Sequence, residues 1–438
     1  MSAFEDVCTE IETAMRETDT PGVAVGLLQE GEEQFAGFGV TSIENPLDVT
    51  PDTLFQIGSI TKTFTATAAM RLIERGALDL DEPIRTYVPE LKLADEDAAA
   101  RVTMRHLLTH TGGWIGDYFD DLGAGDDALA RMVEAIQVLP QLTPLGEVWS
   151  YNNSGFYLAG RTIERVTDLA FEHALQELVL EPLGLENTFF FVDDVMTRRF
   201  SVGHLRADEG PPTVARPWSI GRAAHPAGGL SSTVGDLLRY ARFHMSDGEG
   251  ILTRASLDEM QREQFPVGAS FDAVGLTWML ARFGTRLVIG HGGGTNGQIS
   301  IFAYLPREQL AYAVLTNHQR GNEVIAAVER ALGLAPPERT PVELPVEEYL
   351  GRYTSPSFDA ELRREDGRLV LVYVSNGGFP RKDSPPMPSP PPMHVAFYAT
   401  DRLFITEGPF ENEAAEFLRG PDGGIAWFRL GGRIMSPA

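Results

Sequence analysis

Apolar residues along the first part of the chain are spaced in patterns that predict a helix, a strand pair and a second helix. The N-terminal stretch around Cys8 is amphipathic, with its apolar positions at Phe4, Val7, Ile11 and Met15. Residues 21–40 (PGVAVGLLQEGEEQFAGFGV) predict an antiparallel hairpin that turns near Gly31. Ser59 then begins an apolar helix, and Gly76 is suited to end it because glycine accepts the left-handed conformation found after helix C-termini.

The middle of the chain predicts short helices and loops, and the pattern then changes to strands. Two clear helices are predicted at residues 154–166 and 232–245, the second capped by Ser232 or Thr233. Strand-like segments follow at residues 275–284, 286–294, 298–306 and 310–317. A last helix is predicted at residues 323–332. A hairpin, a helical middle, antiparallel strands and a closing helix favour α+β layers over an alternating parallel sheet.

A proline-rich bridge (GLAPPERTPVELP) separates this part from a C-terminal region that is nearly all strand. We place a first domain, a linker and a second domain at residues 1–335, 336–344 and 345–438. The second domain predicts three hairpins, at residues 360–374, 394–408 and 414–430. Residues 380–394, rich in proline, are too irregular for a strand or helix and predict an exposed loop. Several short strands in about 95 residues predict a small barrel.

Composition narrows the class of protein. The chain has 438 residues, 43% of them hydrophobic, so it can bury a sizeable core. A net charge of −26 argues against binding to nucleic acid or to anionic membrane surfaces. The single cysteine, Cys8, cannot form an internal disulfide. The N-terminus lacks the basic and apolar regions of a signal peptide, and no apolar run reaches the ~18 residues of a membrane span, so we expect a cytoplasmic protein.

One lysine stands out because lysine is so rare in this chain. The chain contains three lysines, Lys62, Lys92 and Lys382, and 19 serines. A random order of these residues would give roughly 0.13 Ser-x-x-Lys pairs. Ser59 and Lys62 form such a pair, and on a helix they share one face. A serine hydroxyl becomes nucleophilic when a base takes its proton, and lysine serves as that base when apolar surroundings lower its pKa. A helix start also supplies backbone N–H groups for an oxyanion. A serine cap followed by a surface lysine is the competing interpretation.

Two further segments carry candidate chemistry. GEVWSYNNSGFYLAG places Tyr151 and Asn153 just ahead of a helix, and VIGHGGGTNGQ places His291 at the end of a strand before three glycines. Glycines at such a position let the backbone approach a substrate closely. Taken alone, Tyr151 is equally explained as a buried aromatic residue and Asn153 as a helix cap.

Together the three segments resemble a known set. Ser-x-x-Lys, Tyr-x-Asn and His-x-Gly in this order are similar to the signature of penicillin-binding-protein-like serine hydrolases, in the branch of class C β-lactamases, D-alanyl-D-alanine carboxypeptidases, family VIII esterases and D-aminopeptidases. VTMRHLLTHTGGW and HPAGGLSSTVGDLLRYA also look like segments of this branch. The resemblance implies a catalytic domain with an antiparallel sheet, flanking helices and a helical subdomain. VEEYLGRYTSP similarly resembles the start of the small, all-β, lipocalin-like barrel that follows it in some cytoplasmic relatives.

The resemblance implies a role for each residue. Ser59 is the acylated nucleophile, and Lys62 and Tyr151 share the general-base work, in an order left open. Asn153 orients Lys62 and the substrate carbonyl. The remaining implied positions are His291 and Gly293 for binding and orienting substrate, and the N–H groups of Ser59 and Gly294 for the oxyanion hole.

The expected reaction is hydrolysis of a small molecule or short peptide through an acyl-enzyme. Gly292 stands where relatives that recognise a carboxylate often carry threonine or serine, which argues against β-lactamase or carboxypeptidase activity. We rank a peptidase or amidase, with D-residues among its candidate substrates, slightly above a carboxylesterase, and a β-lactamase third. A non-catalytic binding protein on the same fold is the alternative class. His106 and His110 have a zinc-like spacing without an intervening Glu, so we expect no metal and no cofactor. We also expect a homo-oligomer whose barrel shields the site.

Overall fold

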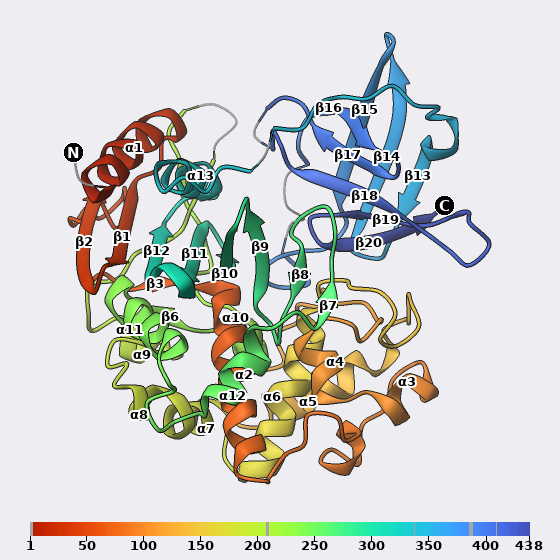
Figure 1. Ribbon diagram of the computed structural model, residues 1–438. Helices are drawn as coiled ribbons and strands as arrows, with labels where there is room; N and C mark the ends of the chain where they lie inside the picture. The colour runs from red at the N-terminus through yellow and green to blue at the C-terminus, as the bar shows by residue number, and fades with distance from the viewer. Residues whose placement is uncertain (1–2, 207–209, 337, 385–388, 409) are drawn as a thin grey trace.

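An antiparallel sheet of eight strands forms the centre of the first domain (Figure 1). The computed structural model describes residues 3–206, 210–336, 338–384, 389–408 and 410–438. In spatial order the strands are β2 (Glu32–Gly39), β1 (Gly22–Gln29), β12 (Leu310–Thr316), β11 (Gln298–Leu305), β10 (Arg286–Thr295), β9 (Met279–Phe283), β8 (Ala273–Val274) and β7 (Phe265–Pro266). The predicted hairpin is confirmed as β1 and β2, with the turn at Glu30 and Gly31.

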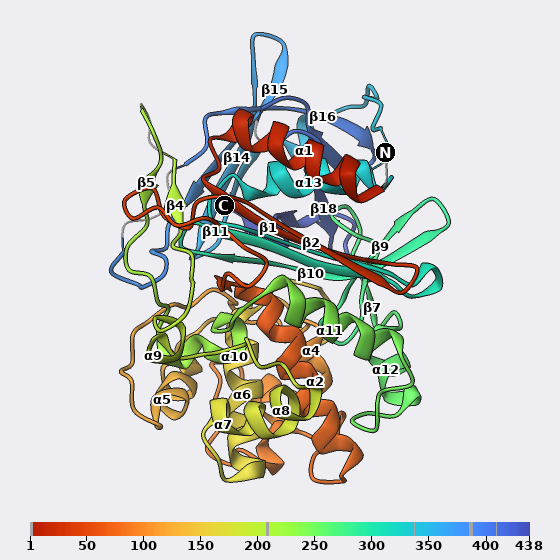
Figure 2. The ribbon, with the colours of Figure 1, turned by 90° about the vertical axis from the view of Figure 1, so that its left-hand side faces the viewer.

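The sheet is covered by helices on both faces, and β1 shows why. Its alternating side chains Val23, Val25 and Leu27 pack with α1 (Ala3–Thr18) and α13 (Gly321–Ala331). Ala24 and Leu28 point to the opposite face, which belongs to the larger core that includes α11 (Val234–Met245). A strand buried on both faces is therefore continuously apolar, as the sequence GVAVGLL is. Figure 2 shows α1 and α13 on one side of the sheet and α11 on the other.

A helical subdomain lies on the α11 side of the sheet (Figure 2). Its helices are α2 (Thr61–Glu74), α3 (Glu96–Arg101), α4 (Met104–Leu108), α5 (Ala128–Ala135), α6 (Asn153–Thr167), α7 (Phe171–Leu175), α8 (Glu181–Leu183), α9 (Val192–Val195), α10 (His225–Gly228) and α12 (Arg254–Gln261). Short strand pairs join β3 (Phe55–Gln56) to β6 (Ser231–Ser232) and β4 (His204–Leu205) to β5 (Thr213–Val214). The cap of α11 is Thr233, whose hydroxyl accepts from Asp236 N, because Ser232 belongs to β6.

The second domain is a closed barrel in which consecutive strands are neighbours, which confirms the predicted barrel. Its strands are β13 (Gly351–Thr354), β14 (Phe358–Glu365), β15 (Arg368–Ser375), β16 (Met393–Ala399), β17 (Arg402–Ile405), β18 (Ala414–Arg419), β19 (Ile425–Leu430) and β20 (Arg433–Pro437). Aromatic rings fill its interior, for example Phe417 and Phe428 with centroids 4.8 Å apart. A filled interior means that the barrel acts through its outer surface and its turns.

A buried ion pair attaches the barrel to the first domain. Arg429 of β19 contacts Glu416 of β18, with 2.6 Å between Nη2 and Oε1, and both side chains are buried. The same Arg429 donates to the carbonyl oxygen of Trp149 at 2.8 Å, and Glu416 accepts from Ala269 N at 2.9 Å. The barrel is therefore anchored beside the segment that carries Tyr151.

Part of the predicted proline-rich loop, residues 385–388, lies outside the described residues. The residues just before them meet the first domain: the rings of Phe379 and Phe119 lie 5.0 Å apart, and Arg381 pairs with Asp121 at 3.2 Å. Within the ranges that the structure describes, none of the helices combines the length and apolar character required to cross a membrane.

Candidate active site

Ser59 and Lys62 meet at the start of α2, as their spacing predicts. A 3₁₀ turn, Gly58–Ile60, precedes the helix and leaves Ser59 on the same face as Lys62. Lys62 Nζ lies 2.9 Å from Ser59 Oγ and donates to the carbonyl oxygen of Ala227 in α10 at 2.6 Å. The Lys62 side chain is fully buried, so its amine is held between these two oxygens.

The surroundings of Lys62 favour its neutral form. Burial lowers the pKa of Lys62 well below its usual value, and the positive charge of Arg433 lowers it further, while Asp117 opposes the shift. A lysine ammonium without a contacting carboxylate is costly to bury, so the free amine is the form that this environment stabilises. A neutral amine can donate to Ala227 and still accept a proton from Ser59.

Tyr151 lies beside this pair. Lys62 Nζ is 5.0 Å from the centroid of the Tyr151 ring, and only 7% of Tyr151 is exposed. Burial raises the pKa of the Tyr151 phenol, whereas the Ser59 side chain and the charge of Arg433 act to lower it. The backbone of Tyr151 is fixed from the barrel, because its N–H donates to the carbonyl oxygen of Gly432 at 2.8 Å.

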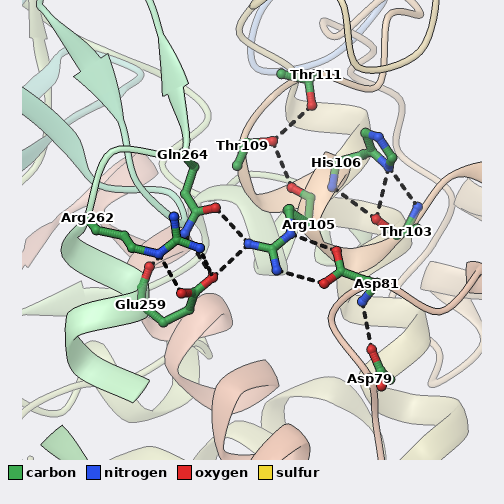
Figure 3. Close-up of polar contacts among 10 residues, drawn as sticks. All are labelled: Asp79, Asp81, Thr103, Arg105, His106, Thr109, Thr111, Glu259, Arg262 and Gln264. Carbon is green, nitrogen blue, oxygen red and sulfur yellow. Dashed lines mark hydrogen bonds and ion pairs between the residues drawn. The ribbon is translucent and has the colours of Figure 1, made fainter. Parts of the chain in front are cut away.

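His110 supports the ring of Tyr151 from the other side. The two rings stack with centroids 4.4 Å apart, and His110 Nδ1 accepts from Asn152 N at 3.0 Å. His110 adopts a positive φ of 57° at the turn after α4. Hydrogen bonds hold that turn, since the Thr109 hydroxyl donates to Arg105 O and contacts the Thr111 hydroxyl (Figure 3).

Arg105 in turn joins three separate segments. Its guanidinium binds Asp81 through two nitrogens at 2.7 Å and also contacts Glu259 and Gln264 (Figure 3). The turn that supports Tyr151 is thereby attached to the loop that carries Asp81, to α12 and to the segment that follows α12.

The glycines after His291 pack against the backbone of the nucleophile segment. A Cβ atom placed on Gly293 would lie 1.9 Å from the carbonyl oxygen of Ile57, and one on Gly58 would lie 2.6 Å from Gly294 N. Gly58 also has a positive φ of 50°. The Gly294 backbone therefore lies close to Gly58, the residue that precedes Ser59.

His291 is nearly fully buried. Its Nδ1 donates to Gly292 O at 2.6 Å, and burial, followed by the charge of Lys62, lowers its pKa to about 3. Its ring centroid is 6.1 Å from that of Tyr151, and Nε2 is a buried atom without a hydrogen-bond partner among the described residues.

Asn153 contacts a residue that the sequence did not suggest. Its Nδ2 donates to Asp117 Oδ1 at 2.7 Å, while the hydrogen bonds of Lys62 described above go to Ser59 and Ala227. Asp117 also accepts from Arg433 Nε at 3.0 Å. The sequence therefore did not predict Asp117, Arg433 or the Ala227 carbonyl as parts of the site. Ala227 and His110 lie in segments that resemble the family, whereas Asp117 and Arg433 carry no motif.

The Ser59 site opens into a large cavity between the two domains, of about 1060 Å³. Its apolar lining includes Tyr118, Phe119, Phe271, Ile220 and Leu139 from the first domain and Phe358 and Phe379 from the barrel. Ser59, Tyr151, Asn153, His291 and Gly292–Gly294 lie on its wall. Among the described residues, no group of three or more His, Cys, Asp or Glu side chains has the arrangement to hold a metal ion.

Comparison with known proteins gives the class. Residues 9–335 match the Beta-lactamase family. Penicillin-binding protein 4 of Amycolatopsis lactamdurans is 33% identical over 313 residues, a match that covers 69% of this chain and 82% of that protein. The chain therefore belongs to the Beta-lactamase family, whose members of the β-lactamase and penicillin-binding-protein type are serine hydrolases.

Solved structures extend the likeness to the barrel. The crystal structure of SurE is 25% identical and covers 100% of this chain and 99% of its own, with a TM-score of 0.77. The octameric penicillin-binding protein homologue from Pyrococcus abyssi is 26% identical, with a TM-score of 0.66, and the match covers 96% of this chain and 97% of that one. D-amino acid amidase from Ochrobactrum anthropi SV3, 25% identical, covers 76% of this chain and 99% of its own, with a TM-score of 0.65.

Proposed function

We propose that this protein is a serine amidase or peptidase that forms an acyl-enzyme on Ser59 and acts on small substrates containing D-amino acids. The observation that carries the proposal is the contact between Ser59 Oγ and the buried amine of Lys62 at 2.9 Å. A serine hydroxyl beside an amine whose neutral form is favoured by burial has a proton acceptor already in place.

In the proposed reaction, Ser59 Oγ attacks the substrate carbonyl carbon and passes its proton to Lys62, with Tyr151 placed to share it. The oxyanion that forms is stabilised by the N–H groups of Ser59 and Gly294. The C–N bond then breaks, and the amine leaves with the proton returned from Lys62 or Tyr151. Water attacks the resulting ester, again losing a proton to this pair, and the acid is released as Ser59 is regenerated.

The substrate class is supported by the shape and lining of the cavity. Its mainly aromatic and aliphatic wall suits apolar side chains, and the position next to His291 is Gly292, which offers no hydroxyl to a substrate carboxylate. The structural likeness to a D-amino acid amidase supports an amide of a D-residue. A carboxylester is the second candidate, since the same acyl-enzyme forms from an ester.

We further propose that the protein is a homo-oligomer and that the barrel limits substrate size. Barrel residues Phe358, Phe379 and Arg433 line the cavity that contains Ser59, so they limit the space that a bound substrate can occupy. The octameric state of the Pyrococcus abyssi homologue, which matches over both domains, supports assembly of this chain as well.

The proposal is tested with one panel of substrates. D- and L-aminoacyl anilides, short-chain nitrophenyl esters and a chromogenic cephalosporin are assayed with the wild-type protein and with Ser59→Ala. We expect the highest kcat/KM for a D-aminoacyl anilide with an apolar side chain, and no turnover by Ser59→Ala. Cephalosporin turnover that far exceeds the others would replace the proposed substrate class, and full activity of Ser59→Ala would remove the proposed nucleophile.

A further inference from the structure

An arginine of the barrel reaches the Ser59 site. Arg433 is the first residue of β20, and its guanidinium carbon lies 4.7 Å from the centroid of the Tyr151 ring. Its Nε and Nη2 contact the two carboxylate oxygens of Asp117 at 3.0 and 3.4 Å, and Nη1 donates to Gly431 O at 2.9 Å. The guanidinium is thus fixed in one orientation by the opposite domain and by its own turn.

The turn that carries Arg433 also holds the backbone of Tyr151. Gly432 accepts from Tyr151 N, and a Cβ on Gly432 would lie 2.9 Å from the Trp149 ring. Gly432 has a positive φ of 77°, so glycine suits both the turn and the close approach. The barrel therefore contacts both the main chain and the ring of Tyr151.

Arg433 places a permanent charge next to two groups that must lose or share protons. Lys62 Nζ and the Arg433 guanidinium lie near the same ring, so at most about 10 Å separates them, a distance at which charges still interact near an effective dielectric constant of 20. Arginine is always protonated in proteins. Its charge therefore disfavours an ammonium on Lys62 and favours a phenolate on Tyr151, while the Asp117 charge acts in the opposite sense.

We propose that Arg433 is a positioning residue of the acylation site, which holds Tyr151 beside Ser59 and keeps the Lys62–Tyr151 pair ready to accept the Ser59 proton. The inference rests on the proposed function and adds that the barrel is part of the catalytic machinery. The buried ion pair between Arg429 and Glu416 already attaches the barrel to the first domain. Attachment alone therefore does not require the ion pair between Arg433 and Asp117.

The electrostatics support this assignment. Arg433 lowers the pKa of Lys62 and of Tyr151, and Asp117 raises both. The other titratable groups that face this cluster are His110 after α4, Tyr157 of α6, His291 of β10, and Tyr373 and Glu413 of the barrel. None of these other groups is a fixed cation. Removing the charge of Arg433 should therefore raise the pKa of Lys62 and of Tyr151, and removing the charge of Asp117 should lower both.

The test is the pH dependence of acylation by a fluorophosphonate, which needs no knowledge of the substrate. Arg433→Gln removes a positive charge, so the acidic limb of the rate profile should move up by about one pH unit, with a lower rate than wild type at each pH on that limb. Asp117→Asn removes a negative charge, so its limb should move down. Arg433→Lys should keep the wild-type limb, and Arg368→Gln, on the exposed barrel surface, serves as the matched control.

We expect the acidic limb to move to higher pH in Arg433→Gln and to lower pH in Asp117→Asn. This expectation is the same whether Lys62 or Tyr151 takes the proton. Limbs that coincide with wild type, or that move in the same direction, would overturn the inference. If Arg433→Gln does not fold, Asp117→Asn decides: an acidic limb at lower pH than in wild type and Arg433→Lys supports the inference, and a limb that coincides with theirs or lies at higher pH overturns it. A wild-type protein that is not acylated at any pH would instead contradict the proposed function.

Discussion

Replacing Gly293 by alanine should disable the site through geometry alone. The added Cβ would lie 1.9 Å from Ile57 O, whereas ordinary C···O contacts are about 3.3 Å, so strand β10 and the nucleophile segment must separate by about 1.4 Å. The nearest atom is a backbone carbonyl oxygen, which cannot turn aside as a side chain can. A displacement of about 1 Å at a reacting group costs on the order of 10²-fold in rate, and overpacking costs about 1–3 kcal/mol of stability.

The neighbouring glycine supplies a matched control. A Cβ on Gly292 meets only Ser300 O, at 3.8 Å, and neither Gly292 nor Gly293 has a positive φ, so the two substitutions differ in space and not in backbone strain. The assay is the second-order rate of fluorophosphonate labelling together with the thermal midpoint of each variant. We expect the labelling rate of Gly293→Ala to be about 10²-fold lower than that of wild type, and the labelling rate of Gly292→Ala to stay within a few-fold of wild type. Equal rates for the two folded variants would refute the steric argument.

Three further predictions concern the barrel interface, the proton acceptors and assembly. Glu416→Gln leaves the buried Arg429 charge without its partner and should cost about 3–5 kcal/mol in denaturant unfolding, whereas Glu361→Gln, at a partly exposed side chain, should cost less than ~1 kcal/mol. Equal losses would contradict the assigned role of the buried pair. Lys62→Ala and Tyr151→Phe should each lower acylation by about 10²–10⁴-fold, the range for positioned acid–base groups, with unchanged circular dichroism. An acylation rate equal to wild type in either would remove that residue from the mechanism. Sedimentation of the full chain should give an oligomer at micromolar concentration, and a monomer would exclude the proposed assembly.

Local chemistry made much of this protein predictable from sequence. The i, i+3 spacing of Ser59 and Lys62 required only a helix to bring them together, and their atoms lie 2.9 Å apart. The apolar patterns of the strands predicted the β1–β2 hairpin and the barrel, because each pattern reports burial on one or both faces of a sheet. The family resemblance, confirmed over residues 9–335, rested on motifs within such local elements.

Contacts made across the domain boundary were not predictable in the same way. Asp117 and Arg433 are 316 positions apart and occur in a loop and at a strand start with no motif around them. Their meeting depends on how the barrel docks, which is decided by the Arg429–Glu416 pair and by the turn at Gly432. Asn153 shows the consequence: the resemblance assigned it to Lys62 and the substrate, and the structure adds Asp117 as its hydrogen-bond partner.

The most direct test of the account is the site of acylation. Wild-type protein and Ser59→Ala are treated with a fluorophosphonate at neutral pH, and the intact mass and the labelled peptide are determined by mass spectrometry. We predict one adduct per chain on Ser59 of the wild type and none on the equally folded Ser59→Ala. An unlabelled wild type, or an adduct of the same stoichiometry on Ser59→Ala, would contradict the claim that Ser59 is the nucleophile of a serine hydrolase.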